Sequence, residues 1–141
     1  MASIRITRDT LTPGTRRLAR ALSPGNRNRL LEAMALEMRS MTVEAFQLTV
    51  DRPAPWAPKR DGSPSNLVKT TALRRSFQVR VSGGRGYVQT DRPYAAAHQF
   101  GSRKRSLPAR PFFPFLNGRL TTPARLRLRA IAQDRLRQLL R

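Results

Sequence analysis

Pro93 is followed directly by Tyr94-Ala95-Ala96-Ala97-His98-Gln99-Phe100-Gly101. Proline is favoured in the first turn of a helix, alanine favours helix, and glycine suits the left-handed backbone that ends one. The run therefore predicts a short helix that stops at Gly101. Tyr94 and His98 lie four residues apart and share one face of this helix. Both side chains can hydrogen-bond while their rings pack, so we expect the pair to hold this turn against its neighbours.

A compact basic loop follows the helix stop. Arg103, Lys104 and Arg105 are adjacent and have no acid nearby in the sequence. Charged side chains of this kind are rarely buried without a partner. We expect all three to be exposed and to face DNA or a partner protein.

Prolines recur every third residue in the next segment, at Pro108, Pro111 and Pro114. That period matches an extended polyproline II segment, whose backbone must find hydrogen bonds elsewhere. The segment carries three phenylalanines, and two interpretations are open: the rings cover the protein's own core, or they dock on a neighbouring subunit. For the second case we expect an interface in which Arg110 reaches a carboxylate. Its residues would be Pro108, Arg110, Pro111, Phe112 and Phe113.

A β-hairpin is predicted upstream of the short helix. Residues 76–82 alternate apolar and polar side chains, residues 83–86 (Gly-Gly-Arg-Gly) supply a turn, and residues 87–90 return. Phe77, Val79 and Val81 would face the core. Residues 3–7 alternate in the same way and predict an additional edge strand.

Three helix starts share one pattern, a hydroxyl residue followed by proline, at Thr12-Pro13, Ser23-Pro24 and Thr122-Pro123. From the second start, a helix to about Val50 carries an apolar stripe of Leu31, Met34, Met38, Met41, Ala45 and Leu48. The stripe is too short for a sustained coiled coil, so packing against a sheet is the favoured interpretation.

The third start predicts a C-terminal amphipathic helix. Its apolar side holds Leu128, Ile131, Ala132, Leu136 and Leu139, and its other side holds Arg125, Arg127, Arg129, Arg135 and Arg137. Such a face is usually just solvated. Arg125 and Arg129 are nevertheless candidates to meet DNA or a partner.

Length and composition limit the fold classes and the kinds of site that the chain can have. A chain of 141 residues without cysteine fits a single α+β domain, 1–141, with no disulfide framework or thiolate metal site. The predicted architecture is a small antiparallel sheet with an N-terminal helical segment and a C-terminal amphipathic helix. Residues 51–66 form a long proline-rich loop that we expect Trp56 to anchor. No apolar run is long enough to span a membrane.

The formal net charge of +20 is concentrated in the second half of the chain. A positive field attracts polyanions such as nucleic acid. However, only three of the 28 basic residues are lysine, which looks like codon bias as much as selection for DNA contact.

Catalysis finds little support in the sequence. Acids are few and scattered, hydroxyl residues have no base available except the single histidine, and the glycine cluster at 83–86 lacks the lysine and hydroxyl residue of a P-loop. We therefore predict a protein that is not an enzyme and uses no cofactor, metal ion or small-molecule substrate.

The motifs above resemble the phage virion morphogenesis family, the tail-completion proteins of Mu-like and P2-like phages. The resemblance rests on the Tyr94–Gly101 run followed by Pro108-Ala109-Arg110-Pro111-Phe112, and it covers residues 56–115. The family usually carries a tryptophan near Trp56. Thr71 stands where the family commonly has glycine, which puts a tight turn there in question.

The resemblance implies a structural virion protein for tail completion and head-to-tail joining. It would be made in the host cytoplasm and form a ring, hexameric to match a tail tube, at the neck-proximal end of the tail. Its partners would be other copies of itself, tail-tube and neck or connector proteins, and the DNA that passes through. Two alternatives stay open: a free basic nucleic-acid-binding protein, and an assembly chaperone absent from the finished virion.

Overall fold

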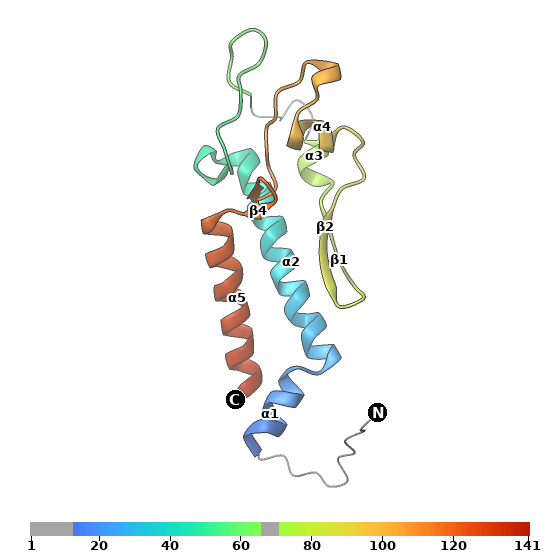
Figure 1. Ribbon diagram of the computed structural model, residues 1–141, viewed down its shortest axis with the longest axis vertical. Coiled ribbons are helices and arrows are strands. Elements are labelled where there is room, and N and C mark those ends of the chain that lie inside the picture. The colour runs from blue at the N-terminus through green and yellow to red at the C-terminus, as the bar shows by residue number, and fades with distance from the viewer. Residues whose placement is uncertain (1–12, 66–70) are drawn as a thin grey trace, which may run out of the picture.

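The computed structural model describes residues 13–65 and 71–141 and has the predicted α+β architecture. The long helix α2 (Pro24–Gln47) runs through the molecule, with α5 (Thr122–Leu140) on one side and the hairpin of β1 (Gln78–Ser82) and β2 (Arg85–Gln89) on the other (Figure 1). α1 (Pro13–Ala21) lies at the end where the C-terminus is found. The short elements gather toward the opposite end: η1 (Thr49–Asp51), α3 (Ala72–Arg75), α4 (Ala95–Phe100), η2 (Arg103–Arg105), β3 (Phe115–Leu116) and β4 (Arg119–Leu120).

The predicted helix starts are confirmed where the structure describes them. α2 begins at Pro24, and the Ser23 hydroxyl accepts a hydrogen bond from the Asn26 backbone N–H at 3.5 Å. α5 begins one residue earlier than predicted, because Thr121 is the N-cap residue and Pro123 lies within the first turn. Thr12 and the strand predicted at residues 3–7 lie outside the described residues.

The apolar stripe of α2 packs on the sheet, as expected, and also on the helix α5. Met41 is buried against Ala124 and Leu128 of α5, with Met34 and Met38 beside it. Other stripe residues meet the sheet as predicted: Ala45 lies in one cluster with Phe77, and Met38 lines a cavity together with Val88 of β2. The helix also ends at Gln47, so the predicted stripe residue Leu48 lies beyond it and is 53% exposed.

The hairpin turn is shorter than predicted. Ser82 pairs with Arg85, which leaves only Gly83 and Gly84 in the turn, with φ values of 57° and 71°. Positive φ at both central residues is the requirement of a type I′ two-residue hairpin turn, and glycine meets it without strain. Gly86 belongs to β2, where a Cβ would lie 3.1 Å from the carbonyl oxygen of Leu31. The absence of a side chain there lets the strand approach α2 closely.

The core is a cluster of aromatic rings from distant parts of the chain. Phe46 of α2 lies 5.6 Å from Trp56, 5.9 Å from Phe77 and 5.3 Å from Phe112, measured between ring centroids. Phe77 and Phe112 are among the largest fully buried side chains of the described residues. Rings at these separations interact favourably beyond the area that they bury. This cluster fixes where α4 and the proline-rich segment lie.

Candidate functional site

The short helix and the proline-rich segment are joined by one glutamine. The side-chain oxygen of Gln99 accepts hydrogen bonds from the backbone N–H groups of Phe112 and Phe113, at 2.9 and 3.0 Å. The carbonyl of His98 accepts a third, from the N–H of Arg110 at 2.7 Å. An extended proline-rich segment cannot satisfy its own backbone. Gln99 and the end of α4 therefore supply the hydrogen-bond acceptors that the backbone of the proline-rich segment needs.

Trp56 and Arg110 hold the same segment from the other side. The indole N–H of Trp56 donates to the carbonyl of Pro111 at 2.7 Å, so this residue does anchor its loop. The guanidinium of Arg110 donates to the carbonyls of Ala57 and Pro58, each at 2.8 Å, and the residue is only 6% exposed. The carboxylate expected as its partner is replaced by backbone oxygens of the same chain.

The burial of this segment differs from the exposed interface that the sequence predicts for it. Phe112 has no exposed surface and Pro111 is buried, so neither side chain is free to touch another subunit. Phe113 is half-buried and Pro108 is exposed. Of the five residues predicted for an interface, only Phe113 and Pro108 have exposed side-chain surface. The core-covering interpretation is the correct one for Phe112.

Only glycine fits at position 101, because of both the backbone angle and the close neighbours there. Its φ is 77°, and a Cβ would lie 3.0 Å from the backbone nitrogen of Ala109 and 3.1 Å from the carbonyl oxygen of Leu107. A side chain would push the returning segment away from α4. By contrast, Thr71 has a φ of −62°, which any residue adopts, so the glycine common at that place in the family is not needed.

Tyr94 and His98 form the predicted pair as a ring contact. Their centroids are 5.9 Å apart with the rings nearly perpendicular. The Nδ1 atom of His98 is buried and has no hydrogen-bond partner among the described residues. Burial, and to a smaller extent the charge of Arg110, lowers the pKa of His98 below its usual 6.5. The imidazole is therefore a neutral packing group at neutral pH.

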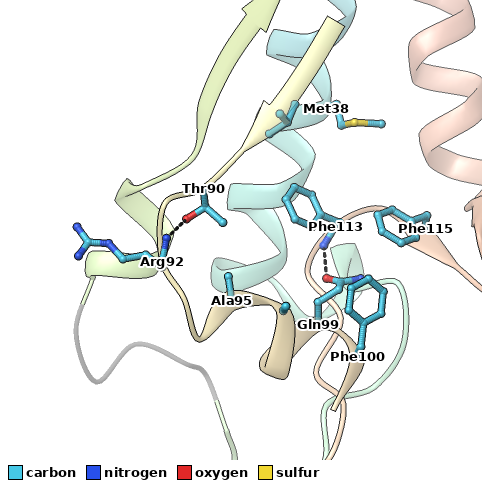
Figure 2. A pocket seen from close by; sticks show the side chains of 10 residues that line it. Met38, Thr90, Arg92, Ala95, Gln99, Phe100, Phe113 and Phe115 are labelled. Carbon is cyan, nitrogen blue, oxygen red and sulfur yellow. Dashed lines mark hydrogen bonds between the residues drawn. The ribbon is translucent and has the colours of Figure 1, made fainter. Parts of the chain in front are cut away.

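Phe100 differs from the rest of the motif because 68% of it is exposed. It stands beside a cavity of about 370 Å³ with a mainly apolar lining (Figure 2). Met38, Val88, Phe113 and Phe115 contribute to that lining, whereas the guanidinium of Arg92 points away from it (Figure 2). We call this the Phe100 groove. Nothing in the sequence pattern predicted it, since its walls come from α2, β2, α4 and the proline-rich segment.

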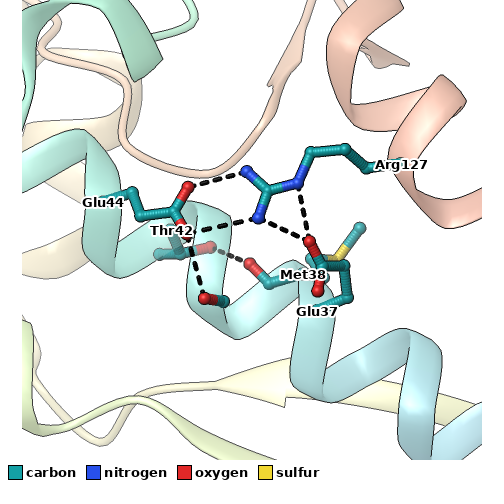
Figure 3. A network of polar contacts seen from close by, with 6 residues as sticks. Glu37, Met38, Thr42, Glu44 and Arg127 are labelled. Atoms are coloured by element: carbon teal, nitrogen blue, oxygen red, sulfur yellow. Dashed lines mark hydrogen bonds and ion pairs between the residues drawn. The ribbon is translucent and has the colours of Figure 1, made fainter. Parts of the chain in front are cut away.

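A polar clamp on the other side of α2 was also missed. Arg127 of α5 donates to Glu37 at 2.6 Å and to Glu44 at 2.7 and 3.2 Å (Figure 3). Its hydrogen bond lowers the pKa of Glu44. The amphipathic pattern of α5 predicts Arg127 on a solvated face, whereas the structure turns it inward onto α2. The seven-residue spacing of the two glutamates on one helix face was the available signal.

The remaining predicted basic residues are exposed. Arg103, Lys104 and Arg105 form η2, and Arg125 and Arg129 project from α5. None of the five forms an ion pair with another residue of the described ranges. Their exposure is as expected, and their partners stay a prediction.

Neither a metal centre nor a membrane span is visible in residues 13–65 and 71–141. No group of three or more His, Asp or Glu side chains there could hold a metal ion. No helix in those ranges is long and apolar enough to cross a membrane.

Comparison with known proteins identifies one family and one relative. Residues 8–137 match the phage virion morphogenesis family. The chain is 35% identical over 107 residues to the "Mu-like prophage FluMu G protein 2" of Haemophilus influenzae, an alignment that covers 72% of this chain and 75% of the relative. No solved structure matches the chain significantly.

Proposed function

The chain belongs to the phage virion morphogenesis family, and we propose that it is a structural protein for tail completion and head-to-tail joining. It forms a ring at the neck-proximal end of the tail, through which the DNA passes. Family membership is the observation that carries this proposal. The structure supports a non-catalytic role, because the motif residues Gln99, Arg110 and Gly101 are used to hold the chain together.

The Phe100 groove supplies one of the two surfaces that a ring requires. Closed rings form by head-to-tail contacts, in which two different patches of each subunit meet. The groove lies on the hairpin side of α2, since Met38 and Val88 line it. Just after the end of α2, Leu48 and Val50 are 53% and 84% exposed, and Val50 lines a hollow together with Ala124 of α5. We assign the Leu48–Val50 corner of one subunit to the Phe100 groove of the next.

The test uses one variant of each surface. Phe100→Ser and Val50→Ser should each abolish rings in native mass spectrometry and fail to complement a phage that lacks this protein. Mixed together, the two variants still offer one intact groove and one intact corner, so they should form dimers but no rings. Leu18→Ser, at the far end of the molecule and 48% exposed, is the control.

Rings and infectivity that persist in both variants would contradict the proposed contact. The location of the protein is tested separately, by mass spectrometry of purified virions and cryo-EM of the neck. A protein needed for tails but absent from virions would be the assembly chaperone instead.

A further inference from the structure

Two loops far apart in the sequence place basic residues at the same end of the molecule. Lys59 and Arg60 belong to the loop after η1, and Arg103, Lys104 and Arg105 form η2. Figure 1 shows both loops at the end opposite the C-terminus. The loops share a depression of about 300 Å³, lined on one side by residues 58–60 and on the other by residues 106–108 and Arg110. We call Lys59, Arg60, Arg103, Lys104 and Arg105 the basic tip.

The tip is held in shape by its own hydrogen bonds. Arg110 ties the carbonyls of Ala57 and Pro58 to the segment that follows η2. The N–H and carbonyl of Ser102 bond to the carbonyl and N–H of Leu107, at 2.8 and 2.9 Å, and this closes the loop that carries η2. The other loop is closed by the Lys59 N–H, which donates to the Ser63 carbonyl at 2.9 Å. Both sets of cations therefore stand on fixed supports.

The charges of the tip are unbalanced. All five cations are exposed, and none forms an ion pair with the rest of residues 13–65 and 71–141. The acid within these loops, Asp61, accepts hydrogen bonds from the N–H and hydroxyl of Ser63. Five positive charges against one negative charge on one small surface favour a polyanionic partner.

We propose that the basic tip binds the phosphate backbone of double-stranded DNA without reading its sequence. The centres of protein–protein interfaces are depleted in charged residues, and lysine in particular is rare there. Leu107 and two prolines line the depression between the loops, but the cations around it are exposed and unpaired within the described residues, and such a surface fits phosphates better than another protein. The inference deepens the proposed function, since it gives a contact for the DNA that passes through the ring.

Fluorescence anisotropy of a labelled duplex of mixed sequence, measured over a range of salt concentrations, tests this. Five neutralised phosphates give a slope of log K against log salt of about −4.5, from roughly −0.9 for each contact. The tip variant replaces Lys59, Arg60, Arg103, Lys104 and Arg105 with Gln. At about 0.15 M salt it should bind at least a hundredfold more weakly, and its slope should fall to about −1 or less in magnitude.

The control removes the same charge from the opposite end, where α2 begins and α5 ends (Figure 1). Arg27, Arg29, Arg135, Arg137 and Arg141 are all exposed, and their replacement with Gln should keep the affinity within about threefold. If both variants lose affinity equally, net charge and not the tip binds DNA, and the proposal is wrong. Tighter binding of polyglutamate than of the duplex, abolished in the tip variant, would also overturn it and indicate an acidic protein partner.

Two further measurements keep the result unambiguous. If the five-residue variant does not fold, the variant of Arg103, Lys104 and Arg105 alone should still reduce the slope by about 2.7. Ring formation by native mass spectrometry is independent of DNA. A protein that binds duplex through the tip but never forms rings would refute the proposed function and leave the DNA contact standing.

Discussion

Replacement of Gln99 by Met tests how the proline-rich segment is held. Methionine keeps the length and apolar packing of the side chain, so little cavity is created. What is lost is the oxygen that accepts hydrogen bonds from the N–H groups of Phe112 and Phe113. Both groups would remain next to a core in which Phe112 is fully buried. We expect a marked loss of stability without a change of fold.

The magnitude follows from the two unpaired donors. A buried N–H that loses its partner costs about 1–3 kcal/mol. The Phe112 bond is buried and the Phe113 bond only partly so, and water can replace some of the second. The variant should therefore be about 2–4 kcal/mol less stable. At roughly 3–4 °C per kcal/mol for a chain of this size, its Tm should fall by about 6–16 °C.

Urea unfolding followed by fluorescence of Trp56, the sole tryptophan, measures this change, because the ring lies in the aromatic core. The m value should stay constant, which shows that the unfolded state is unaffected. Gln133→Met, at an exposed position of α5, is the matched control and should change stability by no more than about 0.5 kcal/mol. A Gln99→Met protein as stable as that control would refute the assignment of Gln99 as the residue that holds this segment.

Two further predictions concern charge. Arg127→Gln should cost about 1–2 kcal/mol at pH 7, a value reduced for screening because the Arg127 side chain is 40% exposed. Arg127 lowers the pKa of Glu44 from 4.5, so this stability is present at neutral pH and is lost as the pH falls below about 4.5. In thermal melts over this range, the stability of the variant should therefore fall less steeply with decreasing pH than that of the wild type. Burial lowers the pKa of His98, so the unfolded chain binds the proton first, and the wild type should lose stability as the pH falls below 6.5. His98→Phe, which keeps a ring beside Tyr94, should lose less over that range, and identical pH profiles would contradict the assignment.

The sequence determined the features that depend on near neighbours. Ser23 with Pro24 marked the start of α2, and the alternation before Gly83 predicted the hairpin. The stop at Gly101 followed from its position after the alanines. Capping, turn chemistry and periodicity act over a few residues, so they can be recognised without knowing the path of the chain.

Only the tertiary structure decided which residues are used inside the molecule. Gln99 bonds to residues 13 and 14 positions away, Arg110 to carbonyls 52 and 53 away, and Arg127 to glutamates 83 and 90 away. The same sequence signals, an arginine between prolines or an arginine on a helix face, are compatible with a solvated surface or an interface. The choice depends on which groups the folded chain brings within hydrogen-bond distance. For that reason Arg110 and Phe112 are internal supports, while Phe100 and the two loops of the basic tip stay exposed.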